Sequence, residues 1–334
     1  MAVVPEPTTS RRVTALDVAR EVGVSRATVG FVLNNTPGQT IPESTRERVL
    51  RAAERLGYRP NSAARALASG RSRIILLVLP DWPVEFRMRD YLDEASLVLD
   101  KAGYSLVTYT RHPDQAARPL WESLNPDLVL GTLPFSSPDV ASMLACGVRE
   151  IYPDPDRPDL PDVSLAFSAG PELQVDHLHE RGHRKLVYAA FTETRASSLV
   201  IARHQAASDR ARLLGLATPD LESVDYRDDS PDVAVRRWLD AGITGVVAFN
   251  DDVAAAIASA AVRAGLRMPA DIAVIGHDDS PIATMFVPAL STIRIDTAAL
   301  GRGFADFVLH RVDRRPLPAP RTSPKPTLVR RETS

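Results

Sequence analysis

Residues 13–29 read VTALDVAREVGVSRATV, and this stretch predicts two short helices joined by a tight turn. Thr14 is a favourable N-cap for the first helix, and Asp17 places a carboxylate in its first turn. Gly23 ends that helix, because glycine readily adopts the left-handed conformation of a helix C-terminus. After one further residue, Ser25 can cap the second helix. The apolar residues that recur at helical spacing are Leu16, Val18, Ala19, Val22, Ala27, Val29, Val32 and Leu33.

This spacing predicts a helix-turn-helix, because two short helices separated by a glycine-containing turn form that motif. Residues 34–38 (NNTPG) interrupt the pattern, and a third helix is expected from about Glu43 to Leu56, closed by Gly57. The second helix starts with short polar and basic side chains. Its N-terminal end is therefore suited to the major groove of DNA, where an arginine can pair with guanine. The alternative is a small helical bundle with no role in DNA binding.

The charge distribution favours a polyanionic partner for the N-terminal part only. Residues 1–73 hold 12 Arg against 6 Asp and Glu, a net charge of +6. The remainder holds 28 Lys and Arg against 36 Asp and Glu, a net charge of −8. We expect nucleic acid to be the partner of the basic part. A solvated basic face is the alternative explanation.

The composition excludes several classes of protein. Hydrophobic residues make up 44% of the chain, but no apolar run reaches the roughly 20 residues of a membrane helix. The single cysteine, Cys146, excludes an intramolecular disulfide framework. Residues 1–12 lack the apolar core of a secretory signal, so we expect a cytoplasmic protein.

Residues 58–70 (YRPNSAARALASG) predict one short alanine-rich helix that Asn61 can cap. The helix has too little apolar surface to be stable alone, so we expect it to become ordered on DNA and against a second copy of itself. Leu67 is its one large apolar residue and could wedge into the minor groove at a flexible base step. An ordinary linker helix is the alternative.

From Ile74 onward, short apolar strands alternate with amphipathic helices, which predicts parallel sheets with helices on both faces. The number of strands is too large for one small sheet, so we predict two lobes and a ligand cleft at the carboxyl ends of the strands. The expected strands are Ile74–Leu79, Tyr104–Tyr109, Leu128–Gly131, Val148–Tyr152, Val163–Ala166, Lys185–Ala190, Leu221–Asp225, Thr244–Phe249 and Ile272–Gly276, with a closing strand at Thr327. The expected helices are about 88–102, 138–145, 170–181, 195–215, 231–241, 251–264 and 297–310.

Polar side chains follow two of these strands. Asn250-Asp251-Asp252 follows Thr244–Phe249, and His277-Asp278-Asp279-Ser280 follows Ile272–Gly276. Arg203 lies in the longest expected helix. Carboxylates, an amide and a guanidinium that converge on a cleft suit a hydroxyl-rich or charged small molecule. Alternatively, these Asp and Asn residues only cap helices and turns.

Catalysis and metal binding have little support in the sequence. His179 and His183 are four residues apart, but Gly182 interrupts the helix between them. There is no Gly-x-Ser-x-Gly elbow, and Gly301-x-Gly303 opens a helix without a phosphate-binding turn before it. We therefore expect no enzymatic activity, no cofactor and no metal site.

Several motifs resemble the lactose-repressor/galactose-repressor (LacI/GalR) family of transcriptional regulators. In the N-terminal part they are residues 13–29, Val32–Asn34, Thr45–Val49 and Leu56–Asn61. In the remainder they are His179–Tyr188, Phe249–Asp251, Asp271–Ser280 and Pro288–Ile293. The resemblance implies an effector domain similar to periplasmic sugar-binding proteins. It also implies that Arg26 and Ala27 read bases, that Leu67 opens the minor groove, and that the effector is held by Arg203, Asn250 and Asp278.

The chain departs from the family pattern at three places. Gly30 and Phe31 stand where the family usually has Ser-Arg, so the operator sequence does not follow from relatives. Residues 166–168 (AFS) replace the usual Asp after a strand, which depletes one side of the polar cleft. Arg203 is followed by His-Gln-Ala, where a glycine is common at the third position.

The predicted fold is an all-α helix-turn-helix DNA-binding domain followed by an α/β, two-lobed, periplasmic-binding-protein-like effector domain with parallel sheets. We expect a tail at 1–12, the DNA-binding domain at 13–60, a hinge helix and linker at 61–73, and the effector and dimerisation domain at 74–334. Within that domain, lobe 1 is expected at about 74–162 and 297–316, and lobe 2 at about 163–296 and 317–334.

We therefore predict a transcriptional regulator, with repression as the expected mode, that binds a pseudo-palindromic double-stranded operator as a homodimer and has no membrane partner. The expected DNA-binding residues are Thr14, Ser25, Arg26, Ala27, Thr28, Phe31, Asn34, Tyr58, Asn61, Ala64, Arg65 and Leu67. The expected effector-binding residues are Asp81, Trp82, Phe135, Arg203, Asn250 and Asp278. The alternatives are an α/β enzyme for sugars or nucleosides with an accessory DNA domain, a transport-type binding protein, and a regulator without a small-molecule effector.

Overall fold

The structure is a computed structural model that describes residues 13–33, 38–58, 70–79, 86–112, 117–131, 134–153, 168–192, 197–316 and 324–334. The chain divides into two compact units, Met1–Ser72 and Arg73–Ser334. Each unit has hydrophobic clusters of its own.

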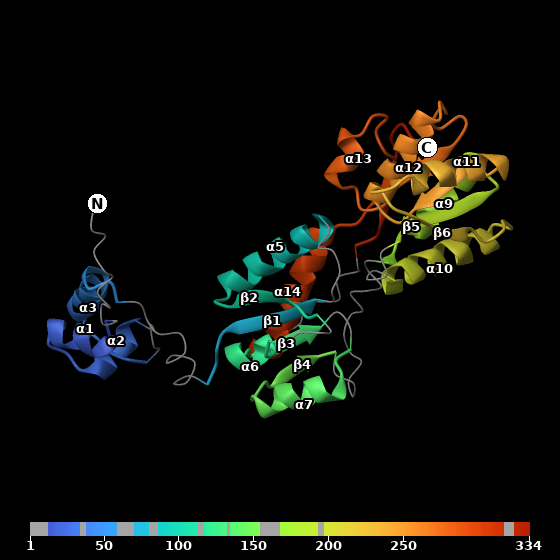
Figure 1. Ribbon diagram of the computed structural model, residues 1–334. Helices are drawn as coiled ribbons and strands as arrows, with labels where there is room; N and C mark the ends of the chain where they lie inside the picture. Colours follow the sequence, from blue (N-terminus) through green and yellow to red (C-terminus); the bar gives the residue numbers. More distant parts are fainter. Residues whose placement is uncertain are drawn as a thin grey trace, which may run out of the picture. The chain divides into compact units, whose positions relative to one another are not determined.

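The first unit holds three helices around a small apolar core (Figure 1). The helices are α1 (Ala15–Val22), α2 (Arg26–Leu33) and α3 (Glu43–Arg55). Thr14 and Asp17 form a reciprocal capping box at the start of α1, and Gly23 ends α1 with φ +73°. The predicted helix-turn-helix is therefore confirmed, with the caps that the sequence indicated. The core side chains are Val18, Ala19, Val22, Val29, Val32, Val49, Ala52 and Ala53.

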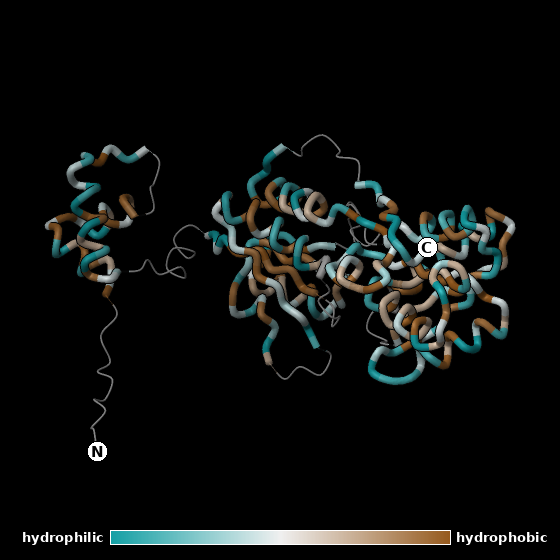
Figure 2. Tube along the Cα trace, turned by 90° about the horizontal axis from the view of Figure 1, so that it is seen from above, coloured by the Kyte–Doolittle hydropathy of each residue, from teal (hydrophilic) through white to brown (hydrophobic). Residues whose placement is uncertain are grey.

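The second unit contains two four-stranded parallel sheets. The first has the order β2-β1-β3-β4 and consists of β1 (Ile74–Leu79), β2 (Ser105–Thr110), β3 (Leu128–Gly131) and β4 (Glu150–Tyr152). Its helices are α5 (Phe86–Lys101), α6 (Leu120–Leu124), α7 (Ser137–Ala145) and α14 (Thr297–Asp313). Strands β1 and β3 consist of apolar residues that are almost all buried, and brown stretches of tube run through the middle of this part in Figure 2.

Alternate residues of β1 pack into two different clusters, so helices cover both faces of the first sheet. Ile75 and Leu77 pack with α5 and α14, whereas Leu76 and Val78 pack with residues of α6 and α7. Helix α14 follows the second sheet in sequence yet packs along α5 (Figure 1). This chain crossing places residue 301 directly against the backbone of α5.

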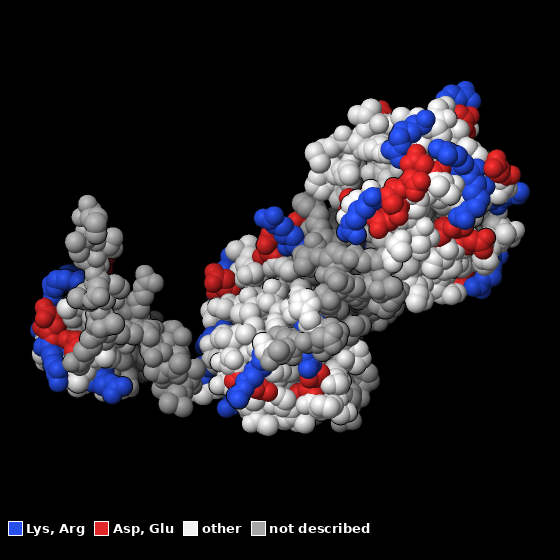
Figure 3. All heavy atoms as spheres, viewed as in Figure 1, with Lys and Arg blue, Asp and Glu red and all other residues white. Residues whose placement is uncertain are grey.

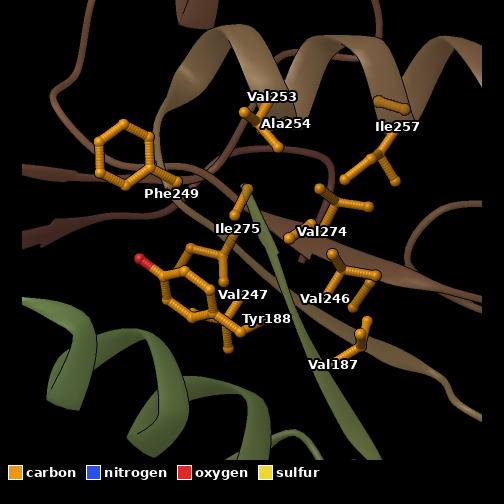
Figure 4. Close-up of a cluster of buried hydrophobic side chains, with 14 of the residues drawn as sticks. Val187, Tyr188, Val246, Val247, Phe249, Val253, Ala254, Ile257, Val274 and Ile275 are labelled. Atoms are coloured by element: carbon orange, nitrogen blue, oxygen red, sulfur yellow. The ribbon is translucent and has the colours of Figure 1, made fainter. Parts of the chain in front are cut away.

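The second sheet has the order β6-β5-β7-β8 and consists of β5 (Leu186–Phe191), β6 (Asp220–Val224), β7 (Gly245–Ala248) and β8 (Ala273–Ile275). Its helices are α9 (Pro171–Glu180), α10 (Ser197–Leu213), α11 (Ser230–Asp240), α12 (Asp251–Arg263) and α13 (Pro281–Met285). Two short antiparallel strands, β9 (Thr292–Arg294) and β10 (Thr327–Val329), pair with each other. Figure 4 shows how Val253, Ala254 and Ile257 of α12 pack over valines of β7 and β8.

The observed fold confirms the predicted fold class. Strands Ile74–Leu79 and Leu128–Gly131 coincide with the prediction, and most other ends differ by one or two residues. The strand predicted at Val163–Ala166 lies outside the described residues. The sequence did not predict α6, α13 or β9, because elements of three to five residues are too short to show a periodic pattern.

Candidate functional site

Helix α2 begins at a side-chain cap in the turn of the helix-turn-helix. Ser25 Oγ accepts a hydrogen bond from the Thr28 backbone N–H at 3.0 Å and lies 2.9 Å from Thr28 Oγ1. Ser25 therefore caps the first turn of α2. Arg26 and Ala27 emerge from this turn with exposed side chains.

One face of α2 points away from the core of the first unit. Val29 and Val32 are buried in that core. With 100° between successive residues, Ala27 and Phe31 lie on the opposite face, one turn apart. Gly30 lies beside them, and a Cβ atom added there would meet nothing within 4 Å. The outward face of α2 thus combines one aromatic ring, two very small residues and the cation of Arg26.

Three of the four arginines of α3 have an acidic partner, whereas Arg26 has none among the described residues. The ion pairs are Arg46–Glu43 at 3.7 Å, Arg51–Glu47 at 3.3 Å and Arg55–Glu21 at 2.8 Å. Arg48 donates to the backbone oxygen of Val22 at 2.5 Å and so ties α3 to the end of α1. Among the described residues, Arg20 and Arg26 of this unit have no acidic partner. Figure 3 shows basic and acidic side chains together on the visible face of this unit.

The remaining residues expected to bind DNA divide into two groups. Thr14 is exposed and is engaged in the α1 capping box, and Tyr58 is half-buried against the bundle core. Those outside the described residues are Asn34, Asn61, Ala64, Arg65 and Leu67.

A second cluster of polar residues lies at the carboxyl ends of β7 and β8. Arg203 of α10 is only 2% exposed. Its Nη1 donates to the Phe249 backbone oxygen at 2.7 Å, and its Nη2 donates to Asp278 Oδ1 at 3.1 Å. The guanidinium also stacks over the Phe249 ring, 4.8 Å from the ring centroid. Arg203 is therefore held on three sides.

Asp278 joins this cluster from the loop after β8. Its φ of +97° is unusual for a residue other than glycine, and its backbone N–H donates to Ile293 O at 2.8 Å. His277 lies between Asp278 Oδ1, at 2.7 Å from Nδ1, and the backbone oxygen of Ala169, at 2.9 Å from Nε2. Burial lowers the pKa of His277, and the charge of Arg203 acts in the same direction.

Asn250 lies next to Phe249 and is almost fully buried. Its Oδ1 accepts the Val253 backbone N–H at 2.9 Å and caps α12. This is the helix-cap role that the sequence left open as the alternative for the Asn and Asp residues after the strands. Asn250 also directly follows Phe249, whose backbone oxygen accepts a hydrogen bond from Arg203.

Two neighbouring carboxylates hold the loop that carries Asp278, and the sequence did not single them out as site residues. Asp251 accepts hydrogen bonds from Ser280 N–H at 2.6 Å and Thr292 Oγ1 at 2.5 Å, and burial raises the pKa of Asp251 to about 7. Burial acts to raise the pKa of Asp279, but ion pairs with Arg331 and Arg294 bring it below its ordinary value. Both aspartates stand in the quoted motifs, but their partners come from β9 and the C-terminal segment, which no local pattern reveals.

The cluster around Arg203 contains a further polar group. The Tyr188 hydroxyl is buried and has no hydrogen-bond partner within the described part of the chain. Burial raises the pKa of Tyr188, and its ring lies edge-on to that of His204 on α10, with the centroids 5.3 Å apart. A tyrosine in the middle of a buried strand gives no sequence pattern that distinguishes it from a core residue.

Phe135, Asp81 and Trp82 are the residues expected to line the ligand cleft from the other lobe. Phe135 is half-buried and packs against the first sheet together with Trp121 and Val129. Asp81 and Trp82 lie outside the described residues.

Two histidines of this region, His177 and His183, have separate hydrogen-bond partners. His177 Nε2 lies 2.9 Å from Ser334 Oγ, and His183 Nδ1 lies 2.9 Å from Thr244 Oγ1. In the described ranges, no group of three His, Cys, Asp or Glu side chains could hold a metal ion. No helix in those ranges is long and apolar enough to cross a membrane.

Both units match known protein families. Residues 14–61 match the family described as "Bacterial regulatory proteins, lacI family", and residues 175–334 match a "Periplasmic binding protein-like domain". Catabolite control protein A of Priestia megaterium is 30% identical over 301 residues, covering 84% of this chain and 87% of the relative. The HTH-type transcriptional regulator GalR of Escherichia coli (strain K12) is 29% identical over 330 residues, covering 96% of this chain and 95% of the relative.

Solved structures agree with the fold. A lac repressor dimer bound to operator and the anti-inducer ONPF superposes with a TM-score of 0.74 at 22% identity, covering 97% of this chain and 99% of that chain. The complex of the transcriptional regulator CelR with cellobiose gives a TM-score of 0.62 at 24% identity, covering 97% of this chain and 100% of that chain. At these identities the structural likeness concerns the fold, and the sequence relatives carry the family assignment.

Proposed function

The chain belongs to the lacI family of bacterial regulatory proteins, and on that premise we propose that it is a sequence-specific transcriptional regulator controlled by a small-molecule effector. The observation that carries the proposal is the outward face of α2, where Arg26 is exposed and has no acidic partner among the described residues, while three of the four arginines of α3 have one. A helix of this kind is suited to the major groove. Repression is the proposed mode, as in the similar ribose operon repressor of Bacillus subtilis (strain 168), which is 28% identical.

We propose that the protein binds its operator as a homodimer. Two copies related by a two-fold axis read a pseudo-palindromic site, because the symmetry of the DNA then mirrors that of the protein. One fold relative is a lac repressor dimer on its operator, which supports this arrangement. The proposed domains are 13–60 for DNA binding, 61–73 for the hinge and 74–334 for the effector. In the hinge, Leu67 is the proposed minor-groove wedge.

The proposed effector site is the cluster around Arg203, with Asn250 and Asp278. The guanidinium, carboxylate and amide are suited to a ligand rich in hydroxyl groups, such as a sugar or nucleoside. In the described state Arg203 is bonded to Asp278 and Phe249 O, so a bound ligand would exchange some of these bonds for its own. The similarity to a CelR–cellobiose complex supports a sugar-like ligand class.

We propose that effector binding changes operator affinity through a coupling free energy of about 1–3 kcal/mol, the usual range for such linkage. The relatives are transcriptional regulators, and we propose no catalytic role for the second unit. The bacterial cytoplasm, where operator DNA lies, is the proposed site of action.

A binding selection tests the DNA-binding half of the proposal. The full-length protein is incubated with random double-stranded DNA at two salt concentrations, and Arg26→Ala is selected in parallel. An enriched palindrome whose affinity falls steeply with salt supports the proposal, since phosphate contacts release counterions. No enriched sequence with the unaltered protein, with or without a panel of sugars and nucleosides, would contradict it.

A further inference from the structure

The position of Phe31 on α2 is not explained by packing of the first unit. The cluster around α1, α2 and α3 includes the half-buried apolar side chains Leu33 and Tyr58, but Phe31 is not part of it within the described residues. By the helical repeat, Phe31 is on the face opposite Val29 and Val32. Phe31 is half-buried, and its ring adds an apolar group to the outward face of α2, where a partner can cover it.

The neighbours of Phe31 allow a flat partner to approach closely. Ala27 lies one turn before Phe31 on the same face. A Cβ atom added at Gly30 would meet no described heavy atom within 4 Å, and glycine itself adds no side chain to this face. Arg26 lies one residue before Ala27 on α2, and Arg20 lies on α1; both are exposed and have no acidic partner in the described ranges. A polyanion with apolar groups on its surface matches both features.

We propose that Phe31, supported by Ala27, reads thymine methyl groups in the major groove of the operator; this rests on the proposed function. Thymine is the one base that presents a methyl group in the major groove, and phenylalanine and alanine can recognise it only through apolar contact. Phe31 has no donor or acceptor, so it rejects guanine and cytosine edges by leaving their polar groups unpaired. Arg26 and Arg20 hold the phosphates or a flanking guanine.

The direct test is a thymine-to-uracil scan, because uracil keeps the base-pairing edge of thymine and lacks only its methyl group. Each thymine of the selected half-site is replaced in turn, and operator affinity of the full-length protein is measured. Burial of one methyl group corresponds to about a fourfold change in affinity. We expect a loss of about three- to fivefold at one or two thymines per half-site and no loss at the others.

The same scan with variants assigns the methyl contact to a residue. In Phe31→Ala the uracil penalty should disappear at the thymine that Phe31 contacts, whereas Phe31→Leu should keep most of it because leucine remains apolar. Leu50→Ala is the matched control, since Leu50 is an exposed apolar residue of α3 in the same unit, 47% exposed. It should leave the penalty unchanged. Far-ultraviolet circular dichroism and nonspecific DNA affinity confirm that each variant is folded.

The outcomes separate this inference from the proposed function. An enriched palindrome with no uracil-sensitive thymine overturns the proposed recognition of thymine methyl groups. It leaves the proposed function as a transcriptional regulator intact. A uracil penalty that persists undiminished in Phe31→Ala also overturns it, because another side chain then makes the contact. Failure to enrich any sequence contradicts the proposed function itself.

Discussion

Arg203 and Asp278 lie 75 positions apart in the sequence and form a buried ion pair, with Arg203 Nη2 3.1 Å from Asp278 Oδ1. Their side chains are 2% and 9% exposed, so neither charge is well hydrated. Removal of one partner from such a pair leaves an uncompensated buried charge. The pair therefore ties the stability of the second unit to the residues proposed to hold the effector.

Replacement of Arg203 by alanine should lower the free energy of unfolding of the second unit by about 3–5 kcal/mol, because Asp278 then keeps a buried carboxylate without its cation. Urea denaturation at pH 7 measures this. Arg212→Ala is the control on the same helix: its ion pair with Asp209 is exposed, with side chains 56% and 53% accessible, and its loss should cost about 0–1 kcal/mol. Equal losses in the two variants would show that the Arg203–Asp278 pair is not buried as described.

Asp251 should give the second unit a pH-dependent stability. Burial raises its pKa from 3.8 to about 7, so the folded state favours the protonated carboxyl more strongly than the unfolded state does. Its contribution is full below about pH 4, falls by about 1.4 kcal/mol per pH unit as the pH rises towards 7, and stays constant above that.

Asp251→Asn tests this directly through the difference in unfolding free energy between the variant and the unaltered protein. Asparagine does not titrate, so the variant should gain relative stability as the pH rises from 4 to 7 and not beyond. Asp279 titrates in the opposite sense, since its lowered pKa stabilises the fold at higher pH and is lost only as the pH falls into the acidic range. A stability difference that does not vary between pH 4 and 7 would contradict the burial of Asp251.

Gly301 and Gly303 of α14 form a matched pair. A Cβ atom at Gly301 would collide with the backbone oxygen of Tyr91 on α5, whereas one at Gly303 would meet nothing within 4 Å. Gly301→Ala should therefore destabilise the second unit by about 1–3 kcal/mol, and Gly303→Ala should stabilise it by about 0.5–1 kcal/mol through helix propensity. Thermal unfolding of both variants decides the matter, and a stabilising Gly301→Ala would exclude the close approach of α5 and α14.

Arg26→Ala should reduce specific operator affinity by about 1–3 kcal/mol if Arg26 pairs with a guanine. A contact with phosphate predicts instead a uniform loss across sequences and a salt slope smaller by about 1. Arg51→Ala is the control, because Arg51 lies on α3 and is paired with Glu47. Fluorescence anisotropy with specific and random duplexes distinguishes these cases, and no change in either affinity would remove Arg26 from the interface.

Local patterns were sufficient to predict the first unit. Thr14, Gly23 and Ser25 act within a few residues of their own positions, and each cap has the partner that the sequence indicated. The alternation of strands and helices likewise predicted the parallel sheets. Short elements such as α13 and β9 were missed because three to five residues show no periodic pattern, and β9 also depends on pairing with the distant β10.

The candidate effector cluster was predicted only in part. The rule that ligands bind at strand carboxyl ends placed Arg203 and Asp278 near each other, but it did not predict that they bond to one another. The roles of Asp251, Asp279 and His277 depend on partners 13 to 108 residues away in sequence, such as Thr292 and Ala169. Phe135, expected to line a ligand site, is half-buried against the first sheet, and its role in ligand binding stays a prediction.

The most direct test of the account is the operator affinity of the full-length protein with and without a bound effector. A panel of sugars and nucleosides is first screened for ligands that raise the unfolding temperature, because a ligand that binds the native state stabilises it. Operator titrations are then made with each stabilising ligand. The account predicts that at least one of them changes the operator dissociation constant by about 5- to 150-fold, and that Arg203→Lys loses this response. The same operator affinity with every stabilising ligand would contradict it.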